Sequence, residues 1–568
     1  MFRTRLWCNP KRLSINSLNE LLPFLRRRKD ASWLGPGLLF AVLTLALFWR
    51  ILIGGQTLIA TDILATSPIW RAQAPPVQNR FLSDTVEFYY PSEKIASEHV
   101  RRGELPLVNR YIFNGAPVPH GIHIWNSVWP AKLIFLLLFD PIRSYDFFAI
   151  FHFWLACLAI HLFLRSLNIG SVAGLTASLA YALSGRSMLW LHGHYLMPTL
   201  AYVPLVFLAA RRRSLLGMIP VAGLFFTNPQ IGLAACAAVV LWERSAWRFI
   251  VPGILMAAVA LVPLAATILE GVRNPREEAG WFYRDGFRSW LWLSGLLVPN
   301  SVQGSMPVNE YNIYVGLLPL AGAIAGARRE RFFAAMAGIA LALATLYPLP
   351  VWFSPISFSL PTRYLFFFTF GACVCFGRAL DQLTHRPWIQ IAAIPLILVD
   401  LIPRFLAWNP AFDPAILRER PPAIAAVRGR TGVYFPDAPT PFFPPLSIFG
   451  IESIQGYGVM VPRSQADALR GVGIVAGQRL IRLTDPENPA LDRLGMRTLI
   501  TDRTYESRRY RRVYDGDVRV YENPSAQDVP PRPVSKVPLG VGLGLTVAAC
   551  LWASAAACLD RLRGQGYS

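Results

Sequence analysis

The chain has 568 residues, of which 54% are hydrophobic and only 16% are charged, and its mean hydropathy is +0.38. Soluble domains usually contain about a quarter charged residues, so this composition excludes an ordinary soluble protein. Apolar runs long enough to cross a bilayer recur along the chain, and they are continuous rather than alternating with polar residues. The sequence therefore predicts an all-α polytopic membrane protein.

The formal net charge of +21 comes from 55 Lys and Arg against 34 Asp and Glu. These basic residues are spread over many short loops. That distribution favours membrane topology and contact with anionic lipid or lipid phosphate, and it argues against nucleic-acid binding. The seven cysteines lie in apolar segments or in the N-terminal tail, so the polar loops show no disulfide framework.

A basic tail, residues 1–34, precedes the first apolar run at 35–54, and no small-residue cleavage site follows that run. We therefore predict an uncleaved anchor with a cytoplasmic N-terminus. Three more apolar runs lead to the basic cluster at 211–213: 147–164, 172–190 and 196–210. The segment 127–139 would make the number of spans odd, and it is short. We predict that it lies in the membrane interface or re-enters, packed on the loop that precedes it.

Further apolar runs obey the same parity: 215–227, 230–242, 249–269, 313–327, 332–347, 363–380, 388–407 and 537–559. The total is about 12 transmembrane helices with both termini cytoplasmic. Residues 35–407 are predicted to form a transmembrane domain whose long external loops are 55–146 and 270–312.

Residues 408–535 are predicted to form a small extracytoplasmic α/β domain. The stretch MRTLIT is typical of a strand, and Asp515-Gly516 fits a tight turn inside RRVYDGDVRVYEN. Residues 536–568 complete the chain as a final transmembrane helix and a short cytoplasmic tail.

The first external loop contains TDILATSPIW, FLSDTVEFYYPS and RRGELPLVNRYIFNGAPV. Together with HGHYLMPTLAYVPLVFLAARR, PTRYLFFFTFGACVCFGRALDQL and FGIESIQGYGVMVPRSQ, this pattern resembles the YfhO family of bacterial multi-pass membrane proteins. The resemblance spans nearly the whole chain. It implies a GT-C-like fold, location in the bacterial cytoplasmic (inner) membrane, and the use of polyprenyl-phosphate sugars. It also implies a functional acid in the first external loop and juxtamembrane helices in that loop.

The resemblance places Asp84 at the position of the catalytic acid. A sugar hydroxyl is a poor nucleophile, and a carboxylate at the membrane surface can accept its proton during attack on the anomeric carbon. Glu87 follows one turn later as a second candidate, and the two carboxylates are also weak candidates for binding a divalent cation. The alternative is structural, because Asp84 and Glu87 have the spacing of a helix capping box.

Six further residues are candidates for binding substrate. Arg363 could meet a lipid phosphate, or it could be an interfacial anchor. Asp62 could be a second acid or a helix N-cap, and Glu310 a ligand of the sugar or a solvated loop acid. The remaining three are Arg284 and Arg288, which lie in an aromatic stretch typical of a membrane-interface belt, and His194. With His120, His123 and His192, His194 forms a histidine set whose spacing matches no common metal motif.

The sequence therefore predicts a membrane glycosyltransferase that moves a sugar from a polyprenyl-phosphate donor to an envelope glycan, polymer or protein. A lipid-linked donor suits a membrane enzyme, because the tail partitions into the bilayer and only the head group needs an aqueous cleft. Two alternatives stay open: a flippase or transporter, and a non-enzymatic assembly factor on the same scaffold.

Overall fold

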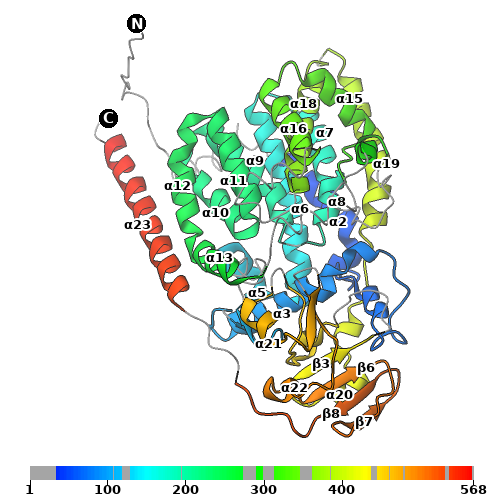
Figure 1. Cartoon of the computed structure of the whole chain (residues 1–568). Helices are drawn as coiled ribbons and strands as arrows, with labels where there is room; N and C mark the ends of the chain where they lie inside the picture. The colour runs from blue at the N-terminus through cyan, green and yellow to red at the C-terminus, as the bar shows by residue number, and fades with distance from the viewer. Residues whose placement is uncertain are drawn as a thin grey trace.

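The computed structural model consists of a helical bundle and, beside one end of it, a small domain that contains β-sheet (Figure 1). We call that end of the bundle the domain end and the opposite one the far end. The structure describes residues 34–106, 108–117, 128–193, 195–272, 290–298, 312–345, 361–383, 385–436, 444–458, 461–476, 480–530 and 536–565.

Five helices in the described ranges are long and apolar enough to cross a membrane. They are α2 (Leu34–Leu52), α6 (Pro141–Ser166), α18 (Leu365–Asp381, extended by the turn before it), α19 (Pro387–Trp408) and α23 (Val537–Gln565). A sixth span is formed if α12 (Trp247–Met256) and α13 (Ala258–Glu270) are taken together, although they meet at a bend of 66°. The chain is therefore a multi-pass membrane protein.

The other predicted spans are helical but shorter than the roughly 20 residues that cross a bilayer. They are α7 (Ser171–Ala182), α8 (Gly185–Trp190), α9 (Met197–Arg212), α10 (Met218–Thr227), α11 (Pro229–Trp242), α15 (Leu317–Gly326) and α16 (Arg331–Thr345). The predicted count of about 12 full-length spans is thus only partly matched. The helices are interrupted by local chemistry: the side chain of Asn228 accepts from the backbone N–H of Ile231, and this cap starts α11 directly after α10 ends.

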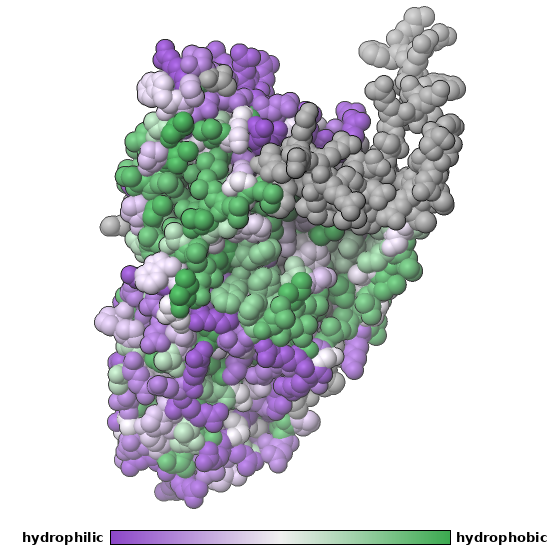
Figure 2. Space-filling model, turned by 180° about the vertical axis from the view of Figure 1, so that it is seen from behind, coloured by the Kyte–Doolittle hydropathy of each residue, from purple (hydrophilic) through white to green (hydrophobic). Residues whose placement is uncertain are grey.

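On the face seen in Figure 2, apolar side chains form a band over the helical part, and polar side chains gather both at its far end and over the part that contains the sheet. In α2, for example, Leu38 and Val42 are 67% and 64% exposed. Such a surface is costly in water but suits contact with lipid tails, so the bundle is the membrane-embedded part.

The first long loop folds into short elements at the domain end. They are η2 (Thr61–Thr66), η3 (Arg80–Leu82), η4 (Thr85–Tyr89), α3 (Tyr90–Arg101), β1 (Val108–Asn109), β2 (Ala116–Pro117) and α5 (Pro130–Leu138). The helix α5 has nine residues and is about 13 Å long, so it cannot cross a bilayer.

A buried ion pair confirms the prediction that the segment 127–139 packs on the preceding loop. The ammonium of Lys132 on α5 lies 2.6 Å from the carboxylate of Glu93 on α3, and both side chains are almost fully buried. Burial lowers the pKa of Lys132, and the attraction of Glu93 opposes that shift. The hydroxyl of Ser144 on α6 also donates to Glu93 at 2.6 Å, so the pair joins three helices.

The α/β domain is built on a four-stranded sheet in the order β3-β6-β8-β7, in which β3 pairs parallel with β6 and the other pairings are antiparallel. A separate hairpin joins β4 and β5. The strands are β3 (Thr431–Tyr434), β4 (Gly473–Ala476), β5 (Leu480–Leu483), β6 (Thr498–Thr501), β7 (Arg511–Asp515) and β8 (Arg519–Glu522). The predicted strand at 496–501 is confirmed over Thr498–Thr501, and the predicted hairpin forms, but Asp515 still pairs with Arg519, so the turn lies at 516–518 rather than at Asp515-Gly516.

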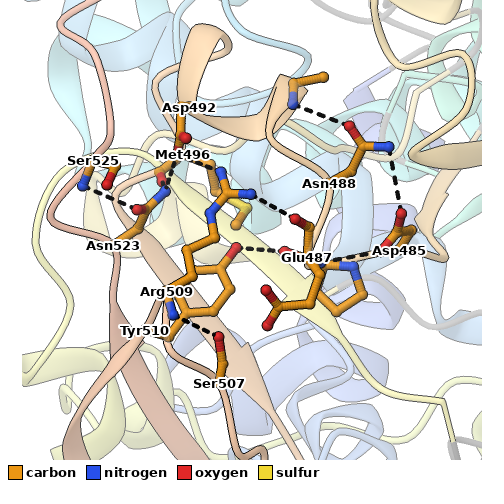
Figure 3. Close-up of polar contacts among 12 residues, drawn as sticks. Asp485, Glu487, Asn488, Asp492, Met496, Ser507, Arg509, Tyr510, Asn523 and Ser525 are labelled. Carbon is orange, nitrogen blue, oxygen red and sulfur yellow. Dashed lines mark hydrogen bonds and ion pairs between the residues drawn. The ribbon is translucent and has the colours of Figure 1, made fainter.

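Short helices flank these strands: α20 (Pro422–Ala425), α21 (Arg463–Ala468) and α22 (Ala490–Arg493). A polar network closes the sheet onto α22 (Figure 3). The amide of Asn523 donates to Asp492 at 2.7 Å and to the carbonyl of Met496 at 3.0 Å, and the guanidinium of Arg509 pairs with the same Asp492. Because one carboxylate binds a donor just before β7 and a donor just after β8, this network ties both strands to α22.

Candidate functional site

Asp84 lies at the start of η4, a π-helical turn that continues directly into α3. Single π-helical turns are rare and are often found at functional sites. The turn places Asp84 and Tyr89 together, and the hydroxyl of Tyr89 donates to Asp84 Oδ2 at 3.4 Å. The hydroxyl of Tyr457, from the α/β domain, donates to Asp84 Oδ1 at 2.9 Å. The carboxylate is therefore oriented through both oxygens and remains partly exposed.

The capping-box interpretation of Asp84 is wrong. Its side chain makes no capping hydrogen bond, and its backbone, at φ −55° and ψ −24°, is already helical. N-cap residues usually have extended backbone angles, which let the side chain fold back over the first turn. The carboxylate instead points to two tyrosine hydroxyls.

A second tyrosine pair continues the cluster into the bundle. The hydroxyls of Tyr89 and Tyr195 are 3.4 Å apart, and their ring centroids are 5.1 Å apart. Burial raises the pKa of Tyr89 well above its ordinary value, and the neighbouring Tyr195 and Asp84 raise it further. Tyr89 therefore stays protonated and acts as a hydrogen-bond donor. Tyr195 comes from the turn between α8 and α9, so the cluster joins the first loop, the bundle and the α/β domain.

Glu87 lies in the same π-helical turn and is half-buried. Within the described residues, no group of three or more histidine, cysteine or acidic side chains could hold a metal ion. Cation binding by Asp84 and Glu87 therefore stays a prediction.

Asp62 is fully buried in η2, where its Oδ2 accepts from the backbone N–H of Gln78 at 2.6 Å. Burial raises the pKa of Asp62, and the hydrogen bond from Gln78 opposes that shift. The predicted N-cap role does not hold, because the N-cap residue of η2 is Ala60. The observed environment is that of a loop anchor, and contact with substrate would require the loop to open.

Arg186 is hydrogen-bonded to the backbone of the residue that precedes Arg363. Arg363 lies in η11 (Pro361–Tyr364), directly before α18, and is half-buried. Arg186 on α8 is fully buried, and its guanidinium donates to the carbonyl of Thr362, the neighbour of Arg363, at 3.2 Å. The guanidinium of Arg186 also lies 5.5 Å from the ring centroid of Trp190, which stacks on Phe366 of α18.

Sequence analysis missed Arg186 because the residue lies inside the predicted span 172–190. One signal could have found it: a charged side chain within an apolar run is costly and is a functional-site candidate by default. The other predicted substrate contacts, Glu310, Arg284, Arg288 and His194, lie outside the described residues.

The fold of this chain is similar to that of a solved membrane glycosyltransferase. A single-particle cryo-EM structure of the arabinofuranosyltransferase AftD from mycobacteria matches 90% of this chain, with a TM-score of 0.52 and 15% sequence identity. A mutant of that enzyme matches 91% of this chain with a TM-score of 0.49, also at 15% identity. The present chain covers 40% and 42% of those two chains, which is less than half of their length.

AftD is a GT-C glycosyltransferase, so the similarity shows that this chain has a GT-C-like fold. No protein-family model and no curated protein sequence matches the chain. The resemblance to the YfhO family therefore stays a prediction.

Proposed function

We propose that the chain is a membrane glycosyltransferase that moves a sugar from a polyprenyl-phosphate donor to an acceptor in the bacterial cell envelope. The observation that carries this proposal is the carboxylate of Asp84, held by two tyrosine hydroxyls at the domain end of a GT-C-like bundle. A partly exposed carboxylate with both oxygens oriented is a suitable general base for a sugar hydroxyl. In this proposal the domain end faces the outside of the cytoplasmic membrane, and both termini are cytoplasmic.

The reaction uses one base and one leaving group. Asp84 takes the proton of the acceptor hydroxyl while the hydroxyl oxygen forms a bond with the anomeric carbon of the sugar. The bond between that carbon and the phosphate oxygen of the lipid breaks, and its electron pair leaves with the lipid phosphate. Arg363, which is half-buried, is the candidate to bind this anion, because a guanidinium group binds phosphate oxygens in a fork. Arg186 is buried beside Thr362 and adds positive charge without contacting the phosphate. A divalent cation held by Asp84 and Glu87 would serve the same purpose.

The test is to replace Asp84 by asparagine, which keeps the size of the side chain but cannot accept the proton. Cells that contain the native chain or Asp84→Asn are compared for envelope glycans and for lipid-linked sugars, with pentosyl and hexosyl donors both measured. Loss of a general base is expected to slow transfer by about 10²- to 10⁴-fold. The variant should therefore accumulate the lipid-linked donor and lack the envelope sugar.

Asp467→Asn is the matched control, because Asp467 is an exposed acid on α21 that pairs with Arg470. It should transfer sugar at the native rate at equal membrane abundance. If Asp84→Asn modifies the envelope as the native chain does, the transferase proposal is wrong. The flippase and assembly-factor alternatives would then be preferred.

A further inference from the structure

A segment of the α/β domain, residues 446–458, lies between that domain and the first long loop. We call it the docking segment. The ring of its Phe449 stacks on Trp70 with centroids 6.2 Å apart, and the ammonium of Lys94 on α3 donates to the carbonyl of Ile448. Because Trp70 and Lys94 flank Asp84 in the sequence, the segment covers the part of the loop that contains the candidate base.

The docking segment also pairs with the loop through its backbone. The N–H groups of Phe113 and Asn114 donate to the carbonyls of Gln455 and Ser453 at 3.0 and 3.1 Å, and the N–H of Ser453 donates back to Tyr111 at 3.1 Å. Three backbone hydrogen bonds over four loop residues amount to strand-like pairing, which fixes the position of the segment along the loop.

Inside the α/β domain, the same segment is held by the buried side chain of Gln455. Its amide oxygen accepts from the N–H of Val433 in β3 at 2.6 Å, and its amide nitrogen donates to the carbonyl of Ile481 in β5 at 3.2 Å. A buried amide that is bonded at both ends leaves the segment little freedom. The residues that follow Gln455 are therefore held in a fixed position relative to β3 and β5.

The next residue, Gly456, brings the segment close to the loop. A Cβ atom on Gly456 would lie 2.6 Å from the Cβ of Ile112, closer than non-bonded carbon atoms approach. Tyr457 follows, and its hydroxyl reaches Asp84 at 2.9 Å while its ring centroid lies 6.1 Å from that of Phe88.

The burial of the cluster shows where an acceptor can enter. Tyr89 and Tyr195 are buried, whereas Asp84 and Tyr457 both keep part of their surface exposed. Solvent therefore reaches the residues of the contact between Asp84 and Tyr457, and an acceptor hydroxyl would approach there rather than past the buried Tyr89 and Tyr195.

We propose that the α/β domain supplies Tyr457 as a positioning residue for Asp84, so that the carboxylate has its productive orientation only when the docking segment is seated on the first loop. This inference rests on the proposed function, because it assigns Asp84 the role of base. The hydrogen bond from Tyr457 is the shorter of the two on Asp84, and it is the one that comes from a different domain. It orients Oδ1 of the carboxylate, which is the group that accepts the proton.

The test is Tyr457→Phe, which keeps the ring and its contact with Phe88 and removes only the hydroxyl. Transfer is measured in isolated membranes that hold the full-length chain, with polyprenyl-phosphate pentose and hexose as donors. We expect kcat to fall by about tenfold, the size expected for a lost hydrogen bond to a charged group. KM for the donor should stay unchanged, because Tyr457 contacts the base and not the lipid-linked sugar in this proposal.

Tyr514→Phe is the matched control, since Tyr514 is a half-buried tyrosine on β7 of the same domain. It should leave kcat and KM unchanged. If Tyr457→Phe has the native kcat and KM while Asp84→Asn is inactive, the inference is wrong and the proposed function survives. A lower rate that comes from a raised KM for the donor at the native kcat also overturns it, because Tyr457 would then act on donor binding and not on the orientation of Asp84. If Asp84→Asn is fully active, the proposed function itself fails.

Discussion

The two ends of the helical bundle are built differently. At the far end, phenylalanine rings from four helices pack together: the ring centroids of Phe163, Phe207 and Phe333 lie 5.6, 5.2 and 5.9 Å from that of Phe370. At the domain end, by contrast, helices are short or broken and charged side chains are buried. These side chains belong to Asp62, Glu93, Lys132 and Arg186.

This difference between the two ends is the basis on which we assign the proposed catalytic function to one of them. Buried charges and interrupted helices each lower stability, and a fold keeps them where their chemistry is needed. The far end has the aromatic packing expected of a stable scaffold. The domain end combines the unfavourable features with an oriented carboxylate and a buried arginine, so it is the end that we assign to catalysis.

The largest effect is expected at the buried ion pair of the domain end. Lys132→Met leaves Glu93 charged and buried without the ammonium that balances its charge, which should lower the free energy of unfolding by about 3–5 kcal/mol. Thermal unfolding of the purified protein in detergent would measure this loss. Because α3 continues from the turn that contains Asp84, transfer should fall as well.

The double variant Lys132→Met with Glu93→Leu sharpens this prediction. It removes both charges, so most of the stability should return. If the single variant is as stable as the native chain, the buried charges do not destabilise the domain end. The proposed difference between the two ends of the bundle is then wrong.

Two substitutions on α18 are expected to have smaller effects on stability and to distinguish a packing role from a role in sugar transfer. Phe370→Ala on α18 empties the centre of the far-end cluster and should cost about 3 kcal/mol of stability. Its transfer rate per folded molecule should stay native, because no candidate catalytic group touches this ring cluster in the described residues.

Phe366→Ala, one turn earlier on the same helix, is the matched variant. Phe366 stacks on Trp190, which holds the buried Arg186, so this variant should lose both stability and transfer rate. Equal loss of rate per folded molecule in Phe366→Ala and Phe370→Ala would contradict the division of the bundle into a scaffold end and a functional end.

Local patterns predicted much of this fold, and long-range contacts account for most of what was missed. The strand that ends at Thr501 and the hairpin that follows Tyr514 depend on residues close in sequence, and both formed, although the turn of the hairpin lies one residue later than predicted. Hydrophobic runs showed where helices lie, but not where caps such as Ser184, which starts α8 inside the predicted run 172–190, would divide them. The contact of Tyr457 with Asp84 joins residues 373 positions apart, which no spacing rule can find in one sequence.

The smallest effect concerns Asp62, a buried acid of the domain end that the proposed chemistry does not use. Its pKa is raised by burial, so the folded state binds the proton more tightly than the unfolded state does. The resulting stabilisation is complete below the ordinary pKa of an aspartate and is lost as the pH rises through the folded value. Asp62→Asn mimics the protonated acid and keeps an oxygen for Gln78. At neutral pH it should be more stable than the native chain by less than about 1 kcal/mol.

Unfolding temperatures of the two chains, measured from neutral to acid pH, should therefore converge as the pH falls. Asp467→Asn controls for the loss of a negative charge and should show no such convergence, because Asp467 is exposed. If Asp62→Asn is less stable than the native chain at neutral pH, the ionised carboxylate strengthens the fold. Asp62 would then stabilise the domain end and would not be one of its destabilising buried charges.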